Sequence, residues 1–191
     1  MAHRQKPRPQ PDRFALDDDP GNYLDFRAHW DVLEPNGAAR ADAPVFQLIH
    51  EARTTRRILQ LLEDQKRSVF CLAALEIIGH SGENRSRGVV TELPTVFATT
   101  LSALIDALAQ AADTKTLHVG FDGEWLTILK GPSPPLGLFA WSPDAGSVIA
   151  DVNDLLAHVM SDTFAQSLDL ASCADGLESL TARIIAMGPG V

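Results

Sequence analysis

The chain has 191 residues, of which 45% are hydrophobic, so its size and composition are those of a globular domain with a sizeable buried core. Its formal net charge of −9 at pH 7 argues against a general affinity for nucleic acids or anionic membranes. No segment has the length of an apolar membrane span, and the basic, proline-rich start has no secretory signal, so we expect a soluble, cytoplasmic protein.

The two cysteines, Cys71 and Cys173, each lie within an apolar pattern of helical type. No C-x-x-C pair is present. We therefore expect both to be small core side chains in a reducing compartment, rather than disulfide partners or ligands.

Charge is distributed unevenly along the chain. Residues 40–87 carry eight basic and six acidic side chains, whereas residues 88–191 carry three basic and twelve acidic ones. Such a distribution arises by chance, or it indicates two faces that meet different partners.

The first part of the chain has few signals of regular structure. Residues 1–13 combine prolines with four basic side chains and no apolar face, so we expect a disordered basic arm. Residues 14–44 contain the turn signals DDPGN and EPNG, and we expect an irregular arm packed on the folded domain of residues 45–191. The aromatic side chains expected to hold this arm are Phe14, Tyr23, Phe26 and Trp30.

Two helices are predicted next, either separate or as one bent rod. In residues 45–65 the apolar side chains recur at helical spacing, with Arg53 and Arg57 on the opposite face. The stripe consists of Leu48, Ala52, Thr55, Leu59 and Leu62. Residues 68–79, SVFCLAALEIIG, are apolar nearly all round, as expected of a buried helix that ends at Gly79. The polar stretch HSGENRSRG reads as a flexible connection.

A third helix and a β-hairpin follow. Residues 94–113 have apolar side chains at helical spacing and begin with a proline, which is tolerated in a first turn. The Asp-Gly pair at 122–123 is a two-residue turn that predicts a hairpin over about 116–129. A third strand is predicted at about 138–142, after a proline-rich loop.

The chain ends with helical patterns. Ser147 is a plausible cap for a helix over 148–159, and a short helix is expected over 163–170. A capping box predicts a last helix over 176–187, which stops at Gly188-Pro189. The capping box consists of Asp175 and Glu178. The sum is a helix-rich α+β domain with a small antiparallel meander.

Metal-binding signatures are missing from the sequence. With Asp17 as first ligand, a calcium loop would need Gly and Glu where Asn22 and Ala28 stand. The six histidines form no H-x-x-x-H or H-E-x-x-H pair. We therefore expect no metal, and the lack of a P-loop or G-x-G-x-x-G motif predicts no cofactor.

The leading functional hypothesis is a non-enzymatic protein-interaction module: an adaptor, an inhibitor, an immunity-type protein or an assembly subunit. An ordinary core, separated charge regions and the lack of catalytic motifs favour it. The surface residues expected to contact a partner protein are Arg53, Arg56, Arg57, Arg85, Arg87, Trp125, Trp141, Asp144, Asp151 and Asp154.

Two alternatives stay open. One is a nucleic-acid-associated factor, in which the predicted arginine helix and the basic arm contact phosphates. The other is a small enzyme with a site built from loops around His80, Glu83 and His118.

Overall fold

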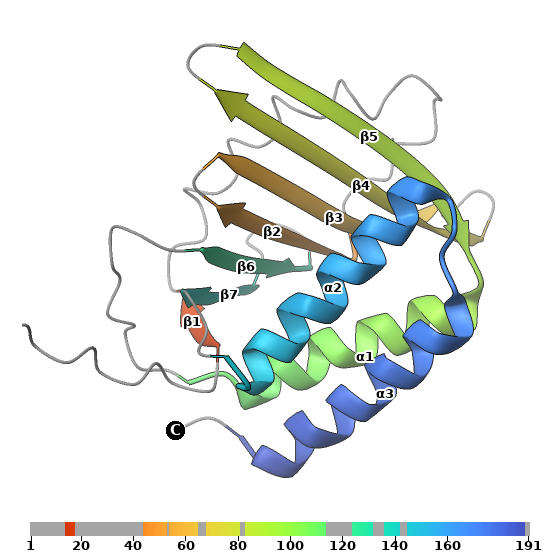
Figure 1. Cartoon of the computed structure of the whole chain (residues 1–191). Coiled ribbons are helices and arrows are strands. Elements are labelled where there is room, and N and C mark those ends of the chain that lie inside the picture. The colour runs from red at the N-terminus through yellow and green to blue at the C-terminus, as the bar shows by residue number, and fades with distance from the viewer. Residues whose placement is uncertain are drawn as a thin grey trace, which may run out of the picture.

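The chain folds around an antiparallel β-sheet with helices on one side of it, as the computed structural model in Figure 1 shows. The structure describes residues 14–17, 44–52, 54–64, 68–80, 83–113, 124–131, 136–141 and 145–189. In this part of the chain, seven strands have the spatial order β1-β7-β6-β2-β3-β4-β5. Their bounds are β1 Ala15–Asp17, β2 Phe46–Ala52, β3 Thr55–Asp64, β4 Val69–His80, β5 Glu83–Leu93, β6 Trp125–Lys130 and β7 Leu136–Trp141.

Three helices complete the described fold, which confirms the predicted α+β class. They are α1 Thr95–Ala111, α2 Val148–Ala165 and α3 Leu170–Met187. The helices α1 and α2 contact the sheet, and α3 packs against both of them. None of the three combines the length and the apolar character that a membrane span requires.

The prediction of two helices between residues 45 and 79 is wrong, because this segment forms strands β2, β3 and β4. In the hairpin of β2 and β3, Leu48 lies opposite Leu59, and Leu59 in turn lies opposite Ala74 on β4. These side chains face the helices and belong to the main core. Leu48 and Leu59, which the helical pattern placed on one helix face, are thus neighbours because their strands pair.

The opposite face of the sheet carries a second apolar cluster. Side chains alternate between faces along a strand, so Ile49, Ile58 and Leu75 point away from the main core. Each of them is at most 4% exposed. The centre of the sheet is therefore apolar on both faces.

The predicted meander is confirmed in part and is larger than expected. Strand β6 lies within the predicted hairpin and pairs with β7, which matches the predicted third strand. Residues 116–123, which hold the predicted first strand and turn, lie outside the described residues. On its other side β6 pairs with β2, so these strands belong to the large sheet.

Strand β1 is the only described part of the predicted N-terminal arms besides Phe14 and Pro44. It pairs with β7, and the backbone of Leu16 donates to the carbonyl of Asp113 after α1 (2.9 Å). Phe14 is 2% exposed in the core. Residues 1–13 and 18–43, where the other predicted arm features fall, are outside the described residues.

The helix ends test the predicted caps. Ser147 caps α2, since its Oγ accepts from the backbone N–H of Ala150 at 3.0 Å, which confirms the prediction. The helix α2 continues to Ala165 and ends at Gln166, so the short helix predicted over 163–170 is wrong. The left-handed backbone of Gln166 (φ 54°) turns the chain there.

The last helix begins earlier than predicted. Asp169 caps α3, because its Oδ1 accepts from the N–H groups of Ala171 and Ser172. The predicted capping box is wrong, since Asp175 and Glu178 both lie inside α3. The predicted stop at Gly188 (φ 72°) is confirmed.

The helix α1 allows a matched test of core packing. Leu104 is fully buried in the main core, whereas Val96 on the same helix is 78% exposed. We expect Leu104→Ala to lower the free energy of unfolding by about 2–5 kcal/mol, because it removes apolar contacts and leaves a cavity. Val96→Ala should change it by no more than about 0.5 kcal/mol. Urea unfolding followed by circular dichroism measures both, and equal effects would contradict this packing.

Candidate functional site

The arginines predicted to share a helix face lie on a strand instead. Arg56 and Arg57 are neighbours on β3, so their side chains project to opposite faces of the sheet. The Nε of Arg56 donates to Glu51 at 2.6 Å, and the Nε of Arg57 donates to Glu76 at 2.9 Å. Arg53 lies outside the described residues. The prediction that Arg56 and Arg57 lie on a helix that binds phosphates is therefore wrong about the helix.

Arg57 and Arg87 both bind the buried carboxylate of Glu76. These three residues lie opposite one another on β3, β4 and β5, with Glu76 in the middle. The Nε of Arg87 donates to Glu76 Oε2 at 2.8 Å, while Arg57 binds Oε1. The guanidinium of Arg87 also lies 4.4 Å from the ring centre of Phe164 on α2. Two of the predicted contact residues thus link neighbouring strands of the sheet, and Arg87 also joins β5 to α2.

The charge of Glu76 is favoured by these partners. Burial alone would raise the pKa of the Glu76 carboxyl, because water stabilises the charged form. The hydrogen bonds from Arg57 and Arg87 and their positive charges outweigh that effect, so the pKa is lowered from its ordinary value. Glu76 is therefore a carboxylate at neutral pH.

The remaining predicted contact residues are spread over the molecule. Arg85 is exposed on β5 and makes no ion pair with another described residue. Trp125 lies opposite Trp141 in the register of β6 and β7, and its ring packs on Phe139 with centroids 4.9 Å apart. Asp144 lies outside the described residues.

Two further predicted contact residues, Asp151 and Asp154, lie on α2. Asp151 binds Arg183 of α3, with 2.6 Å between Oδ2 and Nη1, which ties the two helices together. Asp154 is exposed and makes no ion pair with another described residue.

The loop-built site proposed for an enzyme is only partly described. His80 and Glu83 are paired in register at the end of the β4–β5 hairpin. His118 lies outside the described residues. The structure therefore does not connect the three.

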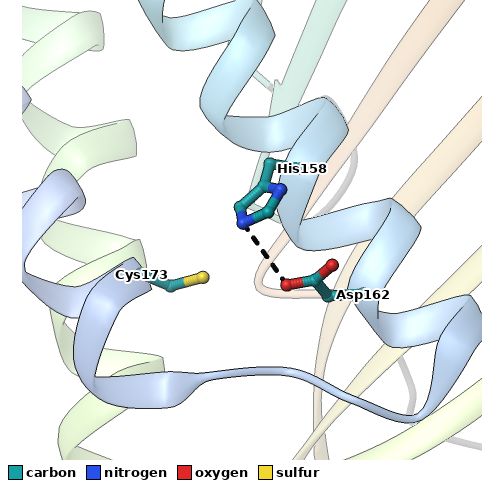
Figure 2. Close-up of side chains that lie close together, drawn as sticks. All are labelled: His158, Asp162 and Cys173. Carbon is teal, nitrogen blue, oxygen red and sulfur yellow. Dashed lines mark ion pairs between the residues drawn. The ribbon is translucent and has the colours of Figure 1, made fainter.

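A different group of side chains converges between α2 and α3. His158 and Asp162 are one turn apart on α2, and Cys173 points at them from α3, as Figure 2 shows. The His158 Nε2 lies 3.4 Å from Asp162 Oδ2. One ligand atom of each residue, including the Cys173 Sγ, lies within 4.8 Å of the other two. We call this group the His–Asp–Cys cluster.

The turn between the helices builds this cluster. Gln166 ends α2 and Asp169 starts α3, so the chain reverses and α3 runs back along α2. Gly176 lies against Leu155, where an added Cβ would approach Leu155 Cδ1 to 3.2 Å. This close approach positions Cys173 beside His158 and Asp162.

The environment of Cys173 keeps its thiol protonated. Burial raises the pKa of Cys173, and the negative charges of Asp162 and Asp169 raise it further. A nucleophilic cysteine needs the reverse, a pKa lowered by nearby positive charge. The cluster is thus unsuited to thiolate catalysis in the absence of a cation.

The sequence contains a signal for this cluster that a search for paired histidines misses. His158 and Asp162 have the spacing i, i+4, which places both on one face of a helix. Cys173 was expected to be buried, and it is 1% exposed. Its place beside two other ligand-type side chains depends on how α2 and α3 pack.

Comparison with known proteins assigns no relatives: no family model, no curated protein and no solved structure matches the chain.

The lowered pKa of Glu76 predicts how stability depends on pH. A carboxyl whose pKa is lower in the folded state stabilises the fold above its unfolded value, here 4.5, and that contribution is lost as the pH falls through the folded value. We expect Glu76→Gln to destabilise the protein by about 1–3 kcal/mol at pH 7, since a charged hydrogen-bond acceptor is removed. The difference from wild type should shrink below pH 4.5.

Urea unfolding at a series of pH values measures this difference. Glu63→Gln is the matched control, because Glu63 is exposed on β3 and makes no ion pair with another described residue. A difference between wild type and Glu76→Gln that stays constant from pH 7 to pH 3 would contradict the role of the carboxylate.

Proposed function

We propose that this protein is a non-enzymatic interaction module, of the adaptor, inhibitor, immunity or assembly-subunit type, that binds a basic surface of another protein through α2 and α3. The observation that supports this most directly is the uncompensated negative charge of these two helices. Residues 145–189 contain six acidic side chains and one basic one. The acidic residues are Asp151, Asp154, Asp162, Asp169, Asp175 and Glu178.

Part of this acidity serves the helices themselves. Asp151 lies in the first turn of α2 and Asp169 caps α3, and both positions favour carboxylates because backbone N–H groups point at them. Asp154, Asp175 and Glu178 have no such role. All three are exposed and form no ion pair within the described part of the chain. Their charge is directed to solvent and would attract a basic partner.

The outward side of α3 has the form of a contact surface. Five of its exposed residues recur at spacings of three and four, so these five lie along one side of the helix. We call them the outer stripe of α3: Ala171, Asp175, Glu178, Ala182 and Ile185. Ile185 is 65% exposed, which places a large apolar side chain beside the acidic ones. Two charges, two small residues and an apolar anchor suit docking against a basic surface with an apolar pocket.

The basic side chains give less support to the alternative function, binding to nucleic acid. Arg56, Arg57 and Arg87 are each bound to a carboxylate. The sole basic residue of α3, Arg183, is bound to Asp151. We also propose a cytoplasmic setting, since Cys71 and Cys173 are both buried and neither is part of a disulfide.

A capture experiment with charge-reversed variants tests the proposal. We expect the tagged wild-type protein to recover a stoichiometric protein partner from lysate of the source organism after nuclease treatment. Glu178→Lys should weaken that complex by about tenfold or more, since it places a repulsive charge where complementarity is required. Because a surface ion pair is screened by salt, recovery should also fall as ionic strength rises from about 0.01 M to about 0.15 M.

Glu63→Lys is the matched control, with the same change in charge at an exposed position on the sheet. It should leave recovery unchanged, and Ile185→Asp should reduce it. A partner that both Glu178→Lys and Ile185→Asp retain at full affinity would contradict binding through α3. Recovery that nuclease abolishes would favour nucleic acid instead.

A further inference from the structure

We propose that the His–Asp–Cys cluster is a binding site for Zn²⁺, in which the metal joins α2 to α3. His158 Nε2, an Asp162 carboxylate oxygen and Cys173 Sγ would be its protein ligands. The inference is independent of the partner proposed above.

The geometry of the three side chains is close to that of a zinc site. With zinc–ligand distances near 2.0–2.3 Å, neighbouring ligand atoms of a tetrahedral site lie about 3.3–3.8 Å apart. His158 Nε2 and Asp162 Oδ2 are already 3.4 Å apart. Because all three ligand atoms lie within 4.8 Å of one another, shifts of about 1 Å complete the arrangement.

The burial of the side chains favours such a shift. Cys173 is held in the core at 1% exposure, so its sulfur provides a fixed point. The side chains of Asp162 and His158 are 21% and 60% exposed, so they are free to rotate toward it. The exposed position of His158 also gives a metal ion access from solvent and leaves room for water as the fourth ligand.

The donor set selects the class of metal. A thiolate and an imidazole are poor ligands for Mg²⁺ and Ca²⁺, which bind oxygen, and good ligands for Zn²⁺. Cysteine sulfur, histidine nitrogen and aspartate oxygen are all zinc ligands, and zinc binds such ligands tetrahedrally. The carboxylate of Asp169 acts on Cys173 electrostatically, so a further negative charge lies near the proposed site and favours a cation there.

Binding of the metal ion releases one proton from the protein. The Cys173 thiol releases its proton to solvent when the sulfur binds the metal, and neutral imidazole and ionised carboxylate bind directly. No redox step is involved.

Cobalt serves as a spectroscopic probe of the same site. We expect the purified, metal-free full chain to bind one Co²⁺, with thiolate-to-metal absorption in the near ultraviolet and the intense visible bands of tetrahedral cobalt. Added Zn²⁺ should remove these bands, and equilibrium dialysis should give one Zn²⁺ per chain. Binding should raise the midpoint of thermal unfolding, because the folded state alone carries the assembled site.

Ligand variants test the assignment. His158→Ala alters an exposed side chain and should preserve the fold while weakening metal affinity by about tenfold or more. Asp162→Asn should act in the same direction, and Cys173→Ser should remove the near-ultraviolet band. Cys71→Ala and His50→Gln are matched controls, since they remove a cysteine and a histidine of the sheet, and they should bind metal like wild type.

The proposal is overturned if wild type shows no saturable cobalt band, or if His158→Ala and Asp162→Asn both bind with unchanged affinity. If Cys173→Ser fails to fold, those two variants still decide the outcome. The metal-binding experiments do not measure partner capture. A negative result for metal binding therefore leaves the proposed partner binding untouched, and the reverse also holds.

Discussion

The structure depends on a sheet whose central strands are buried on both faces. On the helix side, Leu59, Leu61 and Leu72 are inaccessible to water, and on the opposite side Ile58 and Leu75 are nearly so. An antiparallel sheet more often exposes one of its faces. Because β3 and β4 cannot present polar side chains at their centre without cost, polar groups there need partners of their own. The Nε2 of Gln60 donates to Gln47 at 2.8 Å, while its Oε1 has no hydrogen-bond partner among the described residues. Glu76 is bound by two arginines.

This two-sided burial explains which elements the sequence predicts correctly. In a half-buried helix the apolar side chains recur clearly at helical spacing. Residues 94–113 have this pattern, and α1 confirms the predicted helix. A strand that is apolar on both faces loses its alternation, so residues 68–79 resemble a buried helix. The sequence between β2 and β3, Arg53-Thr54, also contains no glycine or asparagine, the residues that mark most tight hairpins. Local sequence therefore predicted the class of fold and missed the size of its sheet.

The sites were harder to predict than the fold, for a related reason. Arg57 and Arg87 look like surface charges in the sequence, but their partner Glu76 is brought to them only by strand register. The cluster of His158, Asp162 and Cys173 likewise depends on the reversal of the chain between two helices. The i, i+4 pair on α2 is visible in the sequence, whereas the cysteine enters through tertiary packing. Pairwise spacing predicts one helix at a time, and both sites span more than one element.

The pairing of β2 with β6 has a consequence for how the chain assembles. Strands β2 to β5 follow one another and pair with their neighbours in sequence, so they form from short loops. In contrast, Leu48 pairs with Ile128, 80 residues further on. Closing so long a loop costs chain entropy that local hairpins avoid, and non-local pairings of this kind slow folding. The pairing of β2 with β6 thus joins β6 and β7 to the sheet that β2 to β5 form locally, and α1 lies between these two parts along the chain.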